Sequence, residues 1–470
     1  MMTHTQPRTE PFEWDLETDL VIVGAGGCGL MAAYVAARRG VEVILLEKDT
    51  RTGCNTELAS GSIPAAGTRF QHALGIEGTA EQMAEDILRK NHGQANPDLV
   101  LTLCRRSRDI IDLLVDEVGI PLTLNTDSSR FGFSFLRLHN PPGRSGAPLV
   151  QAMHAALRRF PNVTFADRTP GAGLVSDDSG AVVGVLAGAN GSERIGAKKV
   201  ILACDGFGAN REMLRQYIPH MAEVECIGAQ GNTGDGIRWG AELGAALAHM
   251  SGHQGHGFVC RGYGTRLLPE MPMLGAIIVN QQGERFTRED QGYSELASVV
   301  LAQPGGTAIE IFDQRIYDIL APNAHFQETV EAGALRTANT LDELAAQFRL
   351  DATTLRRTFD EYARDASNGR DRLGREVFGA PLAPPYYAAT ITGALAHTQG
   401  GLAVDLNARV LRTDGSVIPN LYAGGGTAAG ISGDGADGYL SGNGLLSALG
   451  LGLIAGEHAA QAIQQINSPD

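Results

Sequence analysis

An apolar run that enters a glycine-rich turn is the first recognisable unit of this chain. Residues 19–23 (DLVIV) are followed directly by glycines, which is typical of a buried parallel strand. Residues 30–39 repeat their apolar side chains with helical spacing, and residues 41–46 (VEVILL) have the character of a second strand. The spacing therefore predicts one β-α-β unit near the N-terminus.

The remaining apolar and polar spacing alternates between helical and strand-like stretches. We predict helices over residues 79–91, 98–118, 148–160, 211–217, 352–366 and 444–463, and strands over residues 163–166, 181–186, 199–203, 275–280 and 309–312. Thr340 and Glu343 form a capping-box signature that opens one more helix. Prolines 381, 384 and 385 end the last helix of the middle region.

The order of these elements indicates an α/β protein with two domains. We assign residues 1–251 and 386–470 to a discontinuous Rossmann-like nucleotide-binding domain, and residues 252–385 to an inserted α+β domain that caps it. A chain of 470 residues is long enough for both domains and their cores.

Composition narrows the class of protein. With 43% hydrophobic and 19% charged residues the chain is globular, and a net charge of -15 argues against nucleic acid as a partner. We expect no membrane span, because no apolar run reaches 18 residues. The six cysteines lack the spacing of disulfide frameworks, zinc sites or haem attachment, so we expect no metal site. The polar N-terminus resembles no export signal, and a cytoplasmic location is the simplest expectation.

The glycine turn has the spacing of a dinucleotide site. Gly24, Gly26 and Gly29 lie between the first strand and its helix, where backbone N–H groups can bind a pyrophosphate. Glu47 ends the second strand, where a carboxylate can accept hydrogen bonds from a ribose. A second such unit for a nicotinamide is missing, since the glycine run 424–430 lacks the following strand and acid.

Several further motifs together resemble the fumarate reductase/succinate dehydrogenase flavoprotein superfamily. They occur in order over nearly the whole chain: Lys48 with TGCNT (52–56) and SG (60–61), LACDGFGAN (202–210), TGDGI (233–237), HTQGGL (397–402) and LYAGG (421–425). The resemblance implies FAD as cofactor, an inserted capping domain and an active site between the two domains. It implies that the FAD is contacted by Gly24, Gly26, Gly29, Glu47, Lys48, Asn55, Thr56, Ser60, Ala203, Asn210, Asp235, Gly425, Gly444 and Leu445.

Two departures from that superfamily bear on the chemistry. Members with covalent flavin carry a histidine beside the threonine that corresponds to Thr56, whereas this chain has Asn55, so noncovalent FAD is expected. Dicarboxylate reductases of the superfamily carry arginines at two positions where this chain has Tyr293 and Tyr439. A tyrosine hydroxyl suits a neutral carbonyl oxygen better than it suits a carboxylate.

The C-terminal motif resembles the 3-ketosteroid dehydrogenase branch of the superfamily. Residues 438–445 read GYLSGNGL, and Tyr439, Ser441 and Tyr293 match the reactive side chains of that branch. The resemblance implies an FAD-dependent dehydrogenase that introduces a C=C bond α,β to a ring ketone, in a steroid or a smaller cyclohexanone-type acid. Tyr439 would polarise the ketone while Tyr293, Ser441 or His397 serves as base, and hydride would pass to the flavin.

Alternatives remain open at this point. The main rival is a fumarate reductase-like enzyme for a carboxylic acid, and a flavin-bearing module without turnover is a third class. His253 and His256 suit a structural role better than substrate binding, and one arginine of the set 130, 137 and 144 is a candidate carboxylate ligand. Phe131, Phe133, Phe135, Leu267, Leu268 and Met271 are candidates for an apolar slot. The sequence names no electron acceptor.

Overall fold

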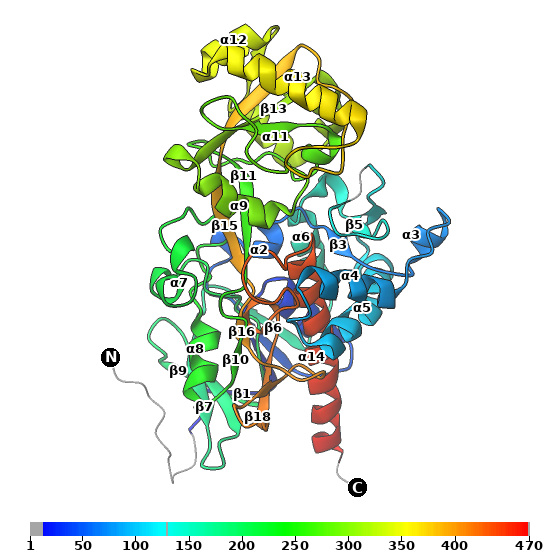
Figure 1. Ribbon diagram of the computed structural model, residues 1–470. Coiled ribbons are helices and arrows are strands. Elements are labelled where there is room, and N and C mark those ends of the chain that lie inside the picture. Colours follow the sequence, from blue (N-terminus) through cyan, green and yellow to red (C-terminus); the bar gives the residue numbers. More distant parts are fainter. Residues whose placement is uncertain (1–12, 128–129, 469–470) are drawn as a thin grey trace.

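A computed structural model describes residues 13–127 and 130–468 of the protein (Figure 1). The larger domain is built on an eight-stranded, mainly parallel sheet. Strand β1 (Leu16–Val23) pairs in parallel with β2 (Val43–Leu46) and β9 (Glu193–Leu202), and α1 (Gly27–Ala37) connects β1 to β2. The predicted β-α-β unit is therefore confirmed. The sheet also contains β6 (Val163–Ala166), β7 (Gly171–Ser176), β8 (Val182–Ala187), β17 (Arg409–Leu411) and β18 (Val417–Ala423).

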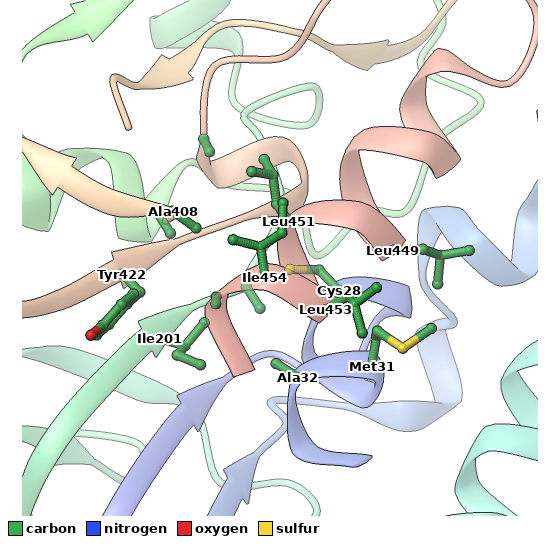
Figure 2. Packing of buried hydrophobic residues seen from close by; sticks show 14 of the residues in the cluster. Cys28, Met31, Ala32, Ile201, Ala408, Tyr422, Leu449, Leu451, Leu453 and Ile454 are labelled. Atoms are coloured by element: carbon green, nitrogen blue, oxygen red, sulfur yellow. The ribbon is translucent and has the colours of Figure 1, made fainter. Parts of the chain in front are cut away.

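Helix α1 packs against the last helix, α14 (Asn443–Asn467), so both ends of the chain share one core (Figure 2). Glycines allow the close approach, because a Cβ on Gly452 would lie 2.4 Å from the carbonyl oxygen of Cys28 and one on Gly456 2.6 Å from that of Ala32. Met31, Leu449 and Leu453 are almost fully buried in this core. Helix packing thus joins the first and last segments of the chain in one core.

The other helices of this domain are α2 (Asn55–Leu58), α3 (Arg69–His72), α4 (Ala80–Lys90), α5 (Pro97–Asp112), α6 (Ala147–Leu157), α7 (Arg211–Tyr217) and α8 (Asp235–Glu242). Of these, α4, α5, α6 and α7 match the sequence predictions, whereas α2, α3 and α8 were not predicted. The predicted helix 98–118 ends as an α-helix at Asp112 and continues as a π-helix over Leu113–Val118. Short strands β3 (Ile63–Pro64), β4 (Thr123–Leu124) and β5 (Leu138–Asn140) form a small sheet beside these helices.

The capping domain is built on a five-stranded antiparallel sheet. Its strands are β11 (His253–Cys260), β12 (Ile277–Val279), β13 (Thr307–Asp313), β14 (Arg336–Ala338) and β15 (Tyr386–Thr398). Its helices are α9 (Tyr293–Leu301), α10 (Gln314–Leu320), α11 (Ala324–Glu331), α12 (Leu341–Phe348) and α13 (Ala352–Asn368).

Strand β15 connects the two domains. It pairs with β11 and β13 of the capping sheet, although the sequence division placed residues from 386 onward in the nucleotide-binding domain. Ala389 and Ile391 belong to the core of the cap, whereas Leu395 belongs to that of the larger domain. Figure 1 shows the strand in orange, running from the cap into the larger domain.

Two absences concern the described part of the chain. None of its helices combines the length and apolar character needed to cross a bilayer. Within the same residues, no three histidine, cysteine, aspartate or glutamate side chains gather as a metal-binding group. Residues 1–12 of the polar N-terminus lie outside the described residues.

Candidate active site

A cavity of about 260 Å³ extends from the β1–α1 turn to the underside of the cap. Its walls come from the end of β2, from α2, from the start of α14 and from cap residues on β11 and α9. The site therefore lies between the two domains, where the sequence analysis expected it.

The β1–α1 turn presents an uncapped helix N-terminus to this cavity. Gly26 is the N-cap of α1 and provides no side-chain hydrogen bond. Gly24 adopts φ +105°, a conformation that favours glycine. A Cβ on Gly26 would have Cys54 Cβ, 3.7 Å away, as its nearest protein atom. The turn thus leaves space for a pyrophosphate at the N-terminus of α1.

Neighbouring polar groups also suit a dinucleotide. The Glu47 carboxylate accepts hydrogen bonds from the N–H groups of Ala25 (2.9 Å) and Asp49 (3.0 Å), which holds it at the end of β2. Thr56 Oγ1 accepts from the Gly27 N–H at 3.1 Å. Asn55 Nδ2 is buried without a partner, so a cofactor oxygen can satisfy it. These residues fit FAD.

The structure separates the expected FAD residues into two groups. All of them line the cavity except Gly29 and Asn210. A Cβ on Gly29 would lie 1.8 Å from the Gly24 carbonyl oxygen, so this glycine allows helix and strand to pack closely. Asn210 instead caps α7 and donates to the Thr233 carbonyl oxygen at 2.9 Å.

The four candidate catalytic residues come together at the cap end of the cavity. Tyr293 opens α9, Tyr439 and Ser441 precede α14, and His397 lies near the end of β15. The rings of Tyr293 and Tyr439 meet edge to face with centroids 6.0 Å apart, and those of His397 and Tyr439 are 5.6 Å apart. Gln254 Nε2 donates to Tyr293 Oη at 3.1 Å. The arrangement brings three hydroxyls and one imidazole together at the cap end of the cavity.

The two phenols differ in their surroundings. Burial raises the pKa of Tyr439 well above its usual value of about 10, and the neighbouring Tyr293 raises it further. Burial also raises the pKa of Tyr293, but Ser441 and Tyr439, followed by Arg130 and Arg266, act to lower it. Tyr439 therefore keeps its proton and donates hydrogen bonds, while Tyr293 is the phenol whose neighbours favour release of a proton.

His397 is held by short polar contacts. Its Nδ1 lies 2.9 Å from Gln399 Nε2 and 3.2 Å from the Thr398 carbonyl oxygen. Burial lowers the pKa of the ring, with Asp205 opposing that shift, so His397 is neutral near pH 7. A neutral imidazole in the cavity can accept a proton.

The arginines singled out in the sequence already have partners. Arg130 pairs with Glu270 at 3.2 Å, Arg137 with Asp86 at 2.6 Å, and Arg144 with Asp127. Arg130 and Arg144 line the cavity, whereas Arg137 does not. Each guanidinium is thus paired with a protein carboxylate, which argues against the candidate role in binding a substrate carboxylate.

The apolar slot predicted for a steroid does not form as expected. Of its six residues only Leu268 lines the cavity; Leu267 and Met271 are buried in the core of the cap, and Phe133 and Phe135 pack on that of the larger domain. Phe131 lies at a separate, smaller pocket. Of the two candidate histidines, His256 lines the cavity and His253 does not.

Sequence reasoning missed several residues that line the cavity. They are Gln254, Arg266, Glu270, Asn323, His325 and Gln399. Arg266 follows a glycine-rich turn in the cap, and no local motif distinguishes it from a surface arginine. Its position in the cavity depends on the bridge between Val259 and Arg266, which only the folded cap establishes.

Comparison with known proteins places this arrangement in a family. Residues 19–445 match the family described as FAD binding domain. The chain is 32% identical over 454 residues to a fumarate reductase (cytochrome) from Shewanella frigidimarina, covering 94% of this chain and 77% of the relative.

Two solved structures share the fold. The open conformation of a flavocytochrome c3 fumarate reductase has a TM-score of 0.80 at 28% identity, covering 96% of this chain and 79% of the other. A 3-ketosteroid-Δ4-(5α)-dehydrogenase from Rhodococcus jostii RHA1, in complex with 4-androstene-3,17-dione, has a TM-score of 0.78 at 27% identity, with coverages of 97% and 99%.

Proposed function

This chain belongs to the FAD-binding fumarate reductase/succinate dehydrogenase flavoprotein superfamily, and we propose that it interconverts a CH–CH bond and a C=C bond beside a carbonyl group of a carboxylic acid. The membership makes the protein an FAD-dependent oxidoreductase acting on CH–CH groups. The observation that carries the proposal is the group of Tyr439, Tyr293 and Ser441 in the cavity at the start of α14.

FAD is bound noncovalently in this proposal. Thr56 has Asn55 as its neighbour, and the Asn55 side chain accepts a hydrogen bond from the Ala229 N–H at 2.8 Å. An amide held in this way offers no nucleophile for attachment of a flavin.

The residues of the site divide the chemistry between them. Glu47, Asn55 and Thr56 would help to hold FAD, which would supply hydride exchange with the β-carbon of the substrate. Tyr439 donates a hydrogen bond to the carbonyl oxygen, and the positive end of α14 favours the negative charge that develops there. Tyr293 exchanges the proton of the α-carbon, with Ser441 as its hydrogen-bonding neighbour.

The relatives support a carboxylic acid as the substrate class. The fumarate reductase relatives are named for a reaction of a carboxylic acid, and the match covers most of this chain. The neutral phenol of Tyr439 donates to either kind of carbonyl oxygen.

Desaturation of a ring ketone without a carboxylate is the second candidate function. Tyrosines instead of arginines at two positions favour it, as does similarity to a solved ketosteroid dehydrogenase. The unformed apolar slot opposes a steroid as the substrate.

The variant Tyr439→Phe tests the proposal. We mix reduced, FAD-loaded protein anaerobically with fumarate, with 4-oxocyclohex-2-ene-1-carboxylate or with cyclohex-2-enone, and follow flavin reoxidation near 450 nm. We expect at least one of the two acids to reoxidise the wild-type flavin fastest. Loss of the phenol should slow that reaction about 10²–10³-fold, because a hydrogen bond that tightens as charge develops is removed.

Tyr263→Phe is the matched control, because Tyr263 is 43% exposed and does not line the cavity. FAD content should equal that of the wild type in both variants. The proposal fails if no probe reoxidises the flavin or if Tyr439→Phe reacts at the wild-type rate. If cyclohex-2-enone reacts faster than both acids, the second candidate replaces the first.

A further inference from the structure

Arg266 is a cation at the cavity that forms no ion pair with any residue that the structure describes. Among the described residues, four lysine and arginine side chains line it, and Lys48 pairs with Asp235, Arg130 with Glu270 and Arg144 with Asp127. Within residues 13–127 and 130–468, no carboxylate lies within 4.0 Å of Arg266, and its guanidinium donates to the carbonyl oxygen of Leu58, at 2.9 Å from Nη2. The five N–H donors of the Arg266 guanidinium are thus only partly used by the protein.

The backbone of Arg266 is held rigidly. It forms an antiparallel bridge with Val259, and its carbonyl oxygen accepts from Thr329 Oγ1 of α11 at 2.8 Å. The side chain then reaches from the cap to the last residue of α2 in the larger domain. A cation fixed from both domains has a defined position over the cavity.

The electrostatic environment of Arg266 calls for an anion. Burial lowers the pKa of its guanidinium, and the opposing influences come from Glu328 and Tyr293. The Glu328 carboxylate is 59% exposed and contacts His325 Nδ1 at 3.1 Å, and it forms no ion pair with Arg266. A half-buried charge without a close partner is poorly solvated, and a bound carboxylate would offset that cost through paired hydrogen bonds.

We propose that Arg266 binds a carboxylate of the substrate, while a separate carbonyl oxygen of the same molecule lies at Tyr439, so that the substrate is an oxo acid. The inference rests on the proposed function for the role of Tyr439. It adds a specificity-determining residue, and it explains how a site with tyrosines in place of arginines takes an acid.

Binding of unreactive probes tests this assignment without turnover. Oxidised, FAD-loaded protein is titrated with cyclohexanecarboxylate and with cyclohexanecarboxamide, a neutral analogue of similar shape, and the dissociation constants are measured by calorimetry. The wild type should bind the carboxylate more tightly than the amide. Arg266→Gln should weaken carboxylate binding at least about 30-fold and leave amide binding within about threefold.

Kinetics with reduced flavin form the second measurement. Arg266→Gln should raise KM for 4-oxocyclohex-2-ene-1-carboxylate far more than it changes kcat, because the lost contact is present before and during the reaction. The rate at which Arg266→Gln reacts with cyclohex-2-enone should differ little from the wild-type rate. Arg266→Lys should lie between the wild type and Arg266→Gln, since it keeps the charge but loses the bidentate geometry.

Arg261→Gln is the matched control, since Arg261 lies on the same turn, is exposed and does not line the cavity. Equal wild-type affinity for carboxylate and amide overturns the role of Arg266 even if no variant folds. Equal losses for both probes in Arg266→Gln overturn it as well. The wild type can bind carboxylate and amide equally well while Tyr439→Phe still slows the reaction with cyclohex-2-enone. In that case the inference about Arg266 fails, and the role of Tyr439 in the proposed function stands.

Discussion

Tyr439 and Tyr293 are both buried, but their neighbours act differently on their pKa values. Both phenols lose solvation, yet only Tyr293 has hydroxyl donors and two arginines acting to lower its pKa. The shared tendency is to remain protonated near neutral pH. A proton donor and a hydrogen-bond donor are therefore available in the reductive direction, and removal of an α-proton in the oxidative direction should accelerate at alkaline pH.

A buried histidine gives a prediction for stability. His139 on β5 contacts Thr68 Oγ1 at 2.9 Å and the Arg137 carbonyl oxygen at 3.1 Å, and burial lowers its pKa from 6.5 to about 4. In the unfolded chain His139 is protonated below about pH 6.5, whereas in the folded chain it stays neutral down to about pH 4. Stability should therefore fall by up to about 3 kcal/mol from this group as pH decreases through that window.

The variant His139→Gln tests this expectation, because it removes the titrating ring and keeps a polar side chain. Urea midpoints are measured between pH 7 and pH 4 for the variant and the wild type. The midpoint of the variant should decline less steeply over that range. Parallel curves would show that His139 does not remain neutral in the folded chain.

At the scale of elements, the turn between β1 and α1 is shaped for an anion. Gly26 has φ -75° and ψ -175°, which a β-branched residue can adopt, and its Cβ position meets no protein atom closer than 3.7 Å. Gly26→Val should therefore fold but exclude the pyrophosphate. The purified variant should lack the flavin absorbance near 450 nm and keep a cooperative thermal transition.

Gly173→Val on β7 is the matched control. Its Cβ position has a comparable nearest contact, 3.6 Å from Leu186 Cδ1, and Gly173 does not line the cavity. This variant should remain yellow. A yellow Gly26→Val protein would contradict the placement of the cofactor at the turn.

At the scale of the whole molecule, the cavity joins segments from both ends of the chain and from the cap. Cofactor residues come from the first strand and helix and from the start of α14, so binding links elements that are far apart in sequence. FAD should consequently raise the Tm, by an amount that grows with its free concentration.

Denaturation tests the noncovalent binding of FAD. Acid precipitation of the yellow protein should leave intact FAD in the supernatant, because Asn55 provides no covalent attachment. Protein stripped of FAD under mild conditions should show a lower Tm that added FAD restores, whereas added riboflavin, which lacks the pyrophosphate, should restore it much less. Colour that remains with the pellet would contradict the proposal.

Local spacing was enough to predict the parts of the fold that depend on neighbouring residues. The β-α-β unit, the glycine turn and the last helix were all predicted, because each is defined by apolar periodicity or glycine spacing within a few dozen residues. The superfamily resemblance was shown by the family match, and it also led to Tyr293, Tyr439, Ser441 and His397, which meet in one cavity.

Long-range packing decided what the sequence left open. Strand β15 belongs to the capping sheet because its partners, β11 and β13, are distant in the chain. Arg130 and Arg144, which were candidate carboxylate ligands, pair with Glu270 and Asp127. Arg266, which belongs to no sequence motif, lines the cavity and forms no ion pair within the described part of the chain. Burial and ion pairing depend on the folded cavity, so no local pattern of residues could identify which of its arginines lacks a carboxylate partner.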